Sequence, residues 1–295
     1  MQAKAIQHIT GHSGAIYDVL VSSDHKIYTT SADKYVTRWD LKTGKQDPFA
    51  IRLEHSGYRI ALSDESAILA IGNARGGIHV IDLNEKKEIR YLTQHQVAVF
   101  ALTYNPFNKE FYSADGDGTF CVWDGTSFDY KLALPFNCGK IRSISLNQDG
   151  SKLLLSCQDG YVRLLETNFF NMLETWKAHP TGVNTSLFLE KGIFTGGKNA
   201  HISKWSQEDN QLLQNIPGHN YAVYDLISIH QENTLVSCSF DKTIKLWNTN
   251  DLSIIQRIER KDKGHKHAVN RLAKINEHEF ISVSDDRVII HWKVE

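Results

Sequence analysis

The sequence has few cysteines, few prolines and no excess of positive or negative charge. Its 295 residues include only 4 cysteines and 5 prolines, and Lys plus Arg number 33 against 34 Asp plus Glu. This balance argues against the broad basic face that drives nucleic-acid binding. The four cysteines are far apart and form no C-x-x-C pair, so we expect reduced, buried thiols rather than a secreted disulfide framework: Cys121, Cys138, Cys157 and Cys238.

Long apolar runs are also missing. No window approaches the roughly 18 uninterrupted apolar residues that a membrane-spanning helix needs. Residues 1–9 alternate apolar and polar side chains and lack the apolar block of a signal peptide. We therefore expect a cytoplasmic protein with neither a membrane partner nor a nucleic-acid partner.

What the sequence does contain is an internal repeat of about 42 residues. Short apolar runs end in a tryptophan five times, and Ile81 and Leu165 lie near the middle of the two longest gaps between these tryptophans. The seven end marks are spaced by 40 to 45 residues: Trp39, Ile81, Trp123, Leu165, Trp205, Trp247 and Trp292. The seven units occupy the whole chain, so we expect one domain over residues 1–295.

Each unit carries two further marks. A histidine precedes the end mark by 26 to 28 residues in six units: His12, His55, His95, His179, His219 and His265. The residue six positions before the end mark is acidic in five units: Asp33, Asp117, Asp159, Asp241 and Asp286. Three marks that recur in register indicate seven copies of one structural unit.

The segments between the marks predict β-strands. In the sixth unit, residues 222–229, 234–239, 243–247 and 253–258 are short, rich in β-branched residues and separated by turn-formers. Several of these runs are too uniformly apolar to have one wet face, which favours small sheets covered on both faces. No segment sustains helical apolar spacing.

A Gly-His pair about 27 residues before Trp-Asp, with an acidic residue six positions before the tryptophan, resembles the WD-repeat family. The resemblance implies an all-β fold, a seven-bladed β-propeller of four-stranded antiparallel blades around a central channel. Only residues 293–295 follow Trp292, so the last unit lacks its fourth strand. We expect residues 4–9 to supply that strand, complete the last blade and close the ring.

The family also implies a structural role for the repeated polar residues. In matching blades, a loop His, a Ser or Thr of the second strand, the turn Asp and the Trp form a buried hydrogen-bonded chain. The expected chains are His12, Thr29, Asp33 and Trp39; His95, Ser113, Asp117 and Trp123; His219, Ser237, Asp241 and Trp247; His265, Ser282, Asp286 and Trp292; and, with Asn199 for the acid, His179, Thr195 and Trp205. The second and fourth blades depart from the pattern, and we expect apolar packing there: Ile71, Arg75 and Ile81, and Cys138, Leu155 and Leu165.

These polar residues do not predict catalysis. A set that recurs once per blade is spread around a ring, whereas a catalytic triad converges on one point. No His-x-x-His or Cys-rich cluster offers closely spaced metal ligands. We therefore expect no enzyme active site, no metal and no cofactor.

A second set of residues flanks the first apolar position of each inner strand or, for Lys198 and Phe240, comes directly before the turn residues Asn199 and Asp241. The resemblance places them on the narrower top face, where protein and peptide partners of the family dock: Tyr17, Tyr58, Arg59, Phe100, Arg142, Asn184, Lys198, Tyr224, Phe240 and Asn270. The second blade is offset by one residue, so Tyr58 and Arg59 are approximate equivalents. Tyr, Phe and Arg dominate binding hot spots, although some of these side chains could instead pack between blades.

Together these observations predict a non-catalytic scaffold, monomeric on its own, that binds a protein or peptide partner at the top face. An aromatic cage for a modified peptide is a special case of this function. The alternative is a small-molecule or glycan binder, or a hydrolase, acting at the channel mouth. Asp18 and Asp225 are the candidate acids for that alternative.

Overall fold

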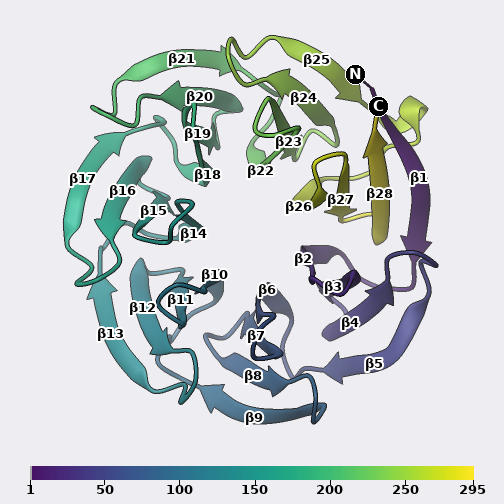
Figure 1. The fold of residues 1–295 in the computed structure, drawn as a ribbon, viewed down its shortest axis with the longest axis vertical. Helices are drawn as coiled ribbons and strands as arrows, with labels where there is room; N and C mark the ends of the chain where they lie inside the picture. The colour runs from purple at the N-terminus through teal and green to yellow at the C-terminus, as the bar shows by residue number, and fades with distance from the viewer. Residues whose placement is uncertain (1) are drawn as a thin grey trace.

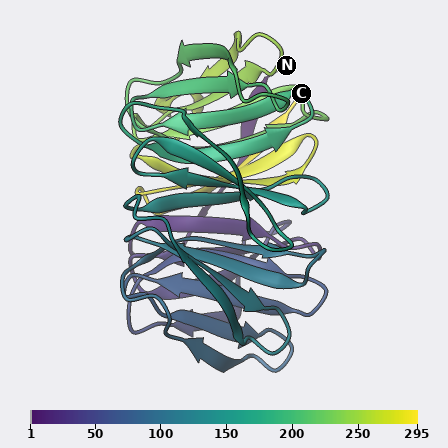
Figure 2. The same cartoon turned by 90° about the vertical axis from the view of Figure 1, so that its left-hand side faces the viewer.

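The computed structural model describes residues 2–295, and nearly all of its regular structure is β-strand. Seven four-stranded antiparallel sheets form a closed ring around a central channel (Figure 1). The strands run from one face of this disc to the other (Figure 2). The seven-bladed β-propeller implied by the family resemblance is confirmed.

In the first six blades, four consecutive strands run from the channel outward. The first three blades are β2 (Ile16–Val21), β3 (Lys26–Ser31), β4 (Tyr35–Asp40) and β5 (Gln46–Arg52); β6 (Gly57–Ser63), β7 (Ile68–Asn73), β8 (Ile78–Asp82) and β9 (Lys87–Leu92); and β10 (Val99–Asn105), β11 (Glu110–Asp115), β12 (Thr119–Asp124) and β13 (Tyr130–Pro135). The next three are β14 (Ile141–Leu146), β15 (Lys152–Cys157), β16 (Tyr161–Glu166) and β17 (Met172–Lys177); β18 (Val183–Leu189), β19 (Gly192–Gly197), β20 (His201–Trp205) and β21 (Leu212–Pro217); and β22 (Val223–Ile229), β23 (Thr234–Ser239), β24 (Ile244–Asn248) and β25 (Ile254–Ile258). The four strands predicted in the sixth unit agree with the observed ones to within one residue at each end.

The seventh blade is completed by the start of the chain. β26 (Val269–Asn276), β27 (Glu279–Ser284) and β28 (Val288–Val294) are joined by β1 (Ala3–Thr10), which pairs antiparallel with β28. Figure 1 shows β1 in purple beside β28 in yellow. The predicted ring closure is confirmed, and the pairing covers an edge of β28 that would otherwise be open.

The core lies between the blades. Trp39 of the first blade packs with Ile281 of the seventh, and Ile81 of the second blade packs with Val36 of the first. Each of the seven end marks is buried in this way against the preceding blade: Trp39, Ile81, Trp123, Leu165, Trp205, Trp247 and Trp292. Burial of a side chain as large as Ile or Leu contributes about 1.5–3 kcal/mol, so the smaller residues at positions 81 and 165 still join their blades.

Helical structure is limited to one 3-10 turn, η1 (Arg260–Asp262), among the described residues. No helix within residues 2–295 has the length and apolar character to cross a membrane. The four cysteines are buried and carry free thiols.

Candidate functional site

The repeated histidines are buried and link residues within one blade. In the sixth blade, Trp247 Nε1 donates to Ser237 Oγ at 2.8 Å, and His219 lies 2.7 Å from the same hydroxyl and 3.0 Å from Asp241. Burial lowers the pKa of His219, and the hydrogen bond from this histidine holds the pKa of Asp241 below its usual range against the opposing effect of burial. A neutral ring with its proton on Nδ1 therefore donates to the carboxylate and accepts from the serine, which satisfies every member of the chain.

The first and seventh blades contain the same chain. In the first blade, His12 lies 2.8 Å from both Asp33 and Thr29, and Trp39 donates to Thr29. In the seventh blade, His265 lies 3.0 Å from Asp286 and 2.8 Å from Ser282, and Trp292 donates to Ser282. In each blade the residues expected from the repeat pattern are brought together.

The third blade uses a different acid from the one expected, and the assignment of Asp117 was wrong. His95 lies 2.8 Å from Asp115 and 2.7 Å from Ser113. Ser113 and Asp115 are two residues apart on β11, so their side chains share one face of the strand and both reach the histidine. Asp117 lies in the following turn, where its backbone N–H donates to Asp115.

The fifth blade has a shorter chain. His179 bonds to Thr195 at 2.9 Å and Trp205 donates to the same hydroxyl at 3.0 Å, while Oδ1 of Asn199 has no hydrogen-bond partner. Burial lowers the pKa of His179 to about 4. Without a carboxylate beside it, this ring has no anionic partner that would favour its charged form.

The second and fourth blades are apolar at the expected positions but are not held by apolar packing alone. Ile71, Ile81, Leu155 and Leu165 are buried. In the second blade, Asn73 also contacts His79 at 3.3 Å and Tyr91 at 3.4 Å, and in the fourth blade Arg163 forms an ion pair with Asp159 at 2.7 Å. The expectation that these blades lack polar networks was therefore incomplete.

All seven inner strands contain a β-bulge near their start on the top face, which is the face that carries the turn acids. In the first blade, Ile16 pairs with Ser31 and Asp18 with Thr30, so Tyr17 has no partner opposite it. The bulge residues are Tyr17, Tyr58, Phe100, Arg142, Asn184, Tyr224 and Asn270. A bulge redirects a side chain, and all seven line one cavity of about 380 Å³, here called the mouth cavity.

The remaining residues assigned from the sequence lie in or beside the same place. Arg59 lines the mouth cavity, and the exposed ring of Phe240 packs on Tyr224 at a centroid distance of 6.1 Å. Lys198 is exposed, and its charge contributes to lowering the pKa of Lys140. The cavity also has two lining residues that the sequence reasoning missed, Lys140 and Asp285.

The positions of Lys140 and Asp285 within the repeat would have identified both as lining residues. Asp285 comes directly before the turn acid Asp286, which is the same offset as Phe240 before Asp241. Lys140 precedes the inner strand of its blade at a position where the other six blades have Ala, Gly or Ser: Ala15, Ser56, Ala98, Gly182, Ala222 and Ala268. The backbone carbonyls of these seven residues each accept a hydrogen bond from the residue that precedes the turn-acid position, which establishes their equivalence.

Aromatic rings cover one side of the mouth cavity. Tyr17 and Tyr58 lie edge to face at 5.2 Å, and Tyr58 lies 5.6 Å from Phe100. Lys140 Nζ and the Arg142 guanidinium lie 4.6 Å and 5.4 Å from the centre of the Phe100 ring. The three rings of Tyr17, Tyr58 and Phe100 are here called the aromatic arc. Its last ring, Phe100, forms cation–π contacts with Lys140 and Arg142.

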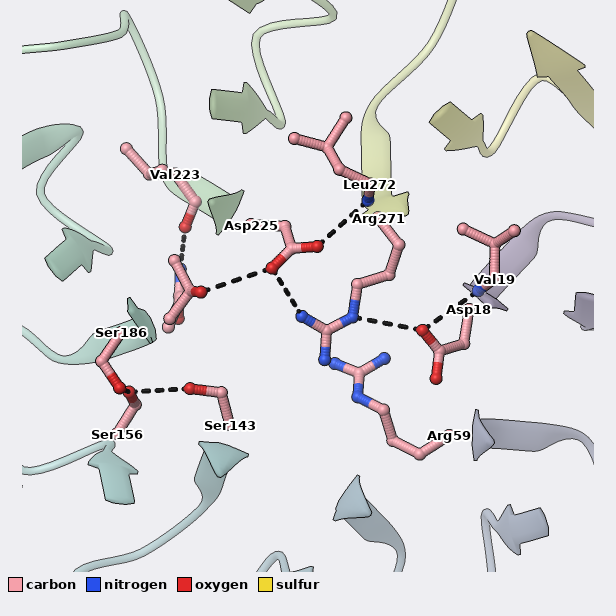
Figure 3. A network of polar contacts seen from close by, with 12 residues as sticks. Asp18, Val19, Arg59, Ser143, Ser156, Ser186, Val223, Asp225, Arg271 and Leu272 are labelled. Atoms are coloured by element: carbon pink, nitrogen blue, oxygen red, sulfur yellow. Dashed lines mark hydrogen bonds and ion pairs between the residues drawn. The ribbon is translucent and has the colours of Figure 1, made fainter. Parts of the chain in front are cut away.

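The residue after each bulge residue lies one position further along its inner strand, and these seven residues are here called the floor ring. The floor ring is Asp18, Arg59, Ala101, Ser143, Thr185, Asp225 and Arg271. Arg59 lines the mouth cavity, whereas Ala101, Ser143, Thr185, Asp225 and Arg271 line a second cavity along the channel. Arg271 lies 3.0 Å from Asp225 and 3.4 Å from Asp18, and the guanidinium groups of Arg271 and Arg59 point toward each other (Figure 3). Two acids and two arginines give the ring no formal net charge.

The floor is held by backbone groups as well as by charges. Arg59 donates to the carbonyl oxygens of Phe100 and Tyr58 at 2.7 Å and 2.9 Å. Asp18 accepts the N–H of Ile60 at 2.9 Å, and Asp225 accepts the N–H of Leu272 at 3.0 Å. Burial and the neighbouring Arg271 lower the pKa of Arg59 to about 9.

The two candidate acids are thus part of a structural floor. Arg271 lies beside both carboxylates, backbone N–H groups donate to them, and neither Asp18 nor Asp225 lines the mouth cavity. The second cavity along the channel has a volume of about 250 Å³ and shares no lining residue with the mouth cavity. Within residues 2–295, no group of three or more His, Cys, Asp or Glu side chains is placed to hold a metal ion.

Comparison with known proteins agrees with this geometry. The family model described as "WD domain, G-beta repeat" matches residues 3–40, 86–124 and 210–248. WD repeat-containing protein 55 of Arabidopsis thaliana is 23% identical over 79% of this chain and 67% of its own length. Kinesin-like protein KIF21B of Homo sapiens is 24% identical over 94% of this chain, and pre-mRNA-processing factor 17 of Homo sapiens is 19% identical over 84% of it.

The chain corresponds to only part of these relatives. It spans 67% of the length of the first, 19% of the kinesin-like protein and 45% of the processing factor. The name of the first relative states only its repeats, and the other two are named as a kinesin-like protein and a pre-mRNA-processing factor.

Proposed function

We propose that this chain is a non-catalytic scaffold that binds a peptide segment of a partner protein in the mouth cavity. The match of its repeats to the WD domain, G-beta repeat model and its seven-bladed ring, a form that typically serves as a protein-interaction scaffold, support the proposal. We propose further that it works in the cytoplasm and is monomeric on its own.

The observation that carries this proposal is the set of seven bulges. Each one turns a side chain toward the same cavity, and five of these side chains are Tyr, Phe or Arg, the types that dominate binding hot spots: Tyr17, Tyr58, Phe100, Arg142 and Tyr224. They are half-buried rather than enclosed. A rigid ring that holds such residues in place loses little entropy when a partner docks.

The floor ring supports a binding role over a hydrolytic one. A hydrolase needs an acid or base within hydrogen-bond reach of its substrate. Asp18 and Asp225 are instead neutralised by Arg271 and hydrogen-bonded to backbone N–H groups. The concave mouth with its rigid floor suits an extended peptide better than a reaction centre.

The test is affinity capture from cells that express the protein natively, followed by mass spectrometry. The wild type is compared with the triple variant Tyr17→Ala, Phe100→Ala and Tyr224→Ala, after their melting temperatures have been matched. A control triple variant carries Phe169→Ala, Leu212→Ala and Leu213→Ala, which remove exposed apolar side chains away from the mouth. The proposal expects the same partner on wild type and control and its loss from the mouth variant; equal capture by the mouth variant would refute it.

A further inference from the structure

The charged residues of the mouth cavity are unevenly distributed around the ring. Lys140, Arg142 and the neighbouring Lys198 belong to the fourth and fifth blades, whereas its one lining acid, Asp285, belongs to the seventh. The floor ring beneath is neutral, so it does not offset this difference. The chain as a whole has a net charge of -1, and the positive side of the mouth is therefore a local feature.

The fourth-blade cations have no anionic partner within the described residues. Neither Lys140 nor Arg142 forms a salt bridge or a side-chain hydrogen bond, although both are half-buried. Both lie over the ring of Phe100. Burial and the proximity of Arg142 lower the pKa of Lys140, and burial lowers the pKa of Arg142. Two like charges held together without a counterion make a site that an anion would stabilise.

The lysine is specific to this blade. At the equivalent position the other blades have small residues, from Ala15 in the first to Ala268 in the seventh. Small side chains leave the entrance open, while Lys140 projects a charge toward the cavity that it lines. The fourth blade therefore differs from the other six by a lysine, Lys140, which places a second positive charge beside Arg142.

We propose, building on the proposed function, that the mouth cavity recognises an acidic peptide segment whose Asp or Glu side chains bind Lys140 and Arg142 and whose neighbouring apolar side chain packs on the aromatic arc. The Arg142 guanidinium offers a two-pronged donor that matches one carboxylate, and Lys140 offers a point charge for a second. Arg59 adds little to this set, because it donates to backbone carbonyls and is balanced by the floor-ring acids.

Asp285 sets the direction of the segment. It lies three blades from Arg142 around the ring and is held by the side-chain amide of Asn270 at 2.8 Å. A carboxylate near Asp285 would be repelled, so the acidic part of the peptide lies toward the fourth and fifth blades. The rest of the segment crosses the mouth toward the seventh.

The donor set favours a carboxylate over a phosphate. A phosphoryl group carries a larger charge and three acceptor oxygens, and it is typically held by a cluster of arginines. The mouth cavity is lined by two arginines, and the guanidinium of Arg59 already donates to backbone carbonyls, which leaves that of Arg142 for a ligand. We therefore assign Asp and Glu side chains as the anionic groups.

The test uses peptides selected on the full chain from a random linear phage library. Each selected peptide is synthesised with a fluorophore and titrated by fluorescence anisotropy, together with a twin in which Asp and Glu become Asn and Gln and a twin in which one acid becomes phosphoserine. The first protein variant is Lys140→Gln with Arg142→Gln. The second carries Tyr17→Ala, Phe100→Ala and Tyr224→Ala and is here called the aromatic triple variant. The control is Lys109→Gln with Lys152→Gln, which removes two exposed lysines, one from the turn after β10 and one from the start of β15.

The proposal expects selected peptides rich in Asp and Glu beside an apolar residue. It expects about 10- to 100-fold weaker binding for the Asn and Gln twin and for the Lys140 and Arg142 variant, and unchanged binding for the control. Neutral or basic peptides that bind at the mouth, or a phosphoserine twin that binds more than tenfold tighter, would overturn the acidic assignment while the proposed function stands. Peptides that the aromatic triple variant still binds, or no selected peptide at all, would count against the proposed function itself.

Discussion

Arg271 of the seventh blade lies 3.0 Å from Asp225 of the sixth, and its Nε lies 3.4 Å from Asp18 of the first. One guanidinium thus joins three neighbouring blades within the floor ring. Removing one partner of a buried ion pair leaves an uncompensated charge and costs about 3–5 kcal/mol.

Arg271→Met should therefore lower the free energy of unfolding by about 3–5 kcal/mol in urea titrations. The matched control is Arg142→Met, since Arg142 has no carboxylate partner, and its cost should stay below about 1 kcal/mol. Equal costs for the two substitutions would mean that Arg271 is not the central partner of the floor ring.

The third blade allows a comparison of two acids two residues apart. Asp115→Asn should cost about 1–2 kcal/mol, because it weakens the charge-assisted bond to His95 and the backbone bonds of the turn. Asp117→Asn should change stability by less than about 0.5 kcal/mol. Chemical denaturation of both variants decides the matter, and the reverse order of costs would restore Asp117 as the partner of the histidine.

Stability should fall in two steps as the solution is acidified. The folded pKa of His179, about 4, lies below its unfolded value of about 6.5. The unfolded chain therefore binds a proton first, and about 3 kcal/mol of stability is lost as the pH falls from about 6.5 to about 4. His12 and His219 act in the same direction.

The second step belongs to the carboxylates of the chains. The pKa of Asp286 lies at about 2, and those of Asp33, Asp115 and Asp241 also lie below their usual range, so their contribution is lost below about pH 4. Urea titrations of His179→Gln between pH 7 and pH 4 check the first step. That variant should have a shallower slope than wild type, and a slope equal to that of wild type would contradict the role of His179.

Removal of residues 1–9 should strongly destabilise the protein or make it prone to aggregation. The deletion takes away β1, which pairs with β28 from Ala3 to Thr10, and exposes the buried Ile9 contacts and an open strand edge. Differential scanning calorimetry and light scattering measure the effect. A shorter deletion that stops before Ala3 is the control, and an unchanged melting temperature after the longer deletion would contradict the role of β1 in closure.

The fold could be predicted almost completely from the sequence, because its signals are local and repeated. Tryptophan, histidine and the turn acid return every 42 residues, and even Ile81 and Leu165 fill the place of the tryptophan. The exception at Asp115 has a clear cause. Two acids flank Gly116, and their spacing from His95 does not distinguish them, whereas the alternation of side chains along β11 does.

The mouth was less predictable, because its chemistry depends on contacts between blades. Asp18 and Arg271 are 253 residues apart, and only closure of the ring makes their blades neighbours. Sequence reasoning accordingly located Asp18 and Asp225 but not the arginine that neutralises them. Lys140 was detectable in principle, since it is the one charged residue in a column of small ones.

The most direct test of the account is site-specific photo-crosslinking in cells that express the protein natively. A photoreactive phenylalanine analogue replaces Phe100 in the mouth cavity or, as control, Phe169, which is 81% exposed and does not line that cavity. Binding at the mouth predicts a partner crosslinked at position 100 and absent at position 169. A partner crosslinked at position 169 and not at position 100 would contradict the account.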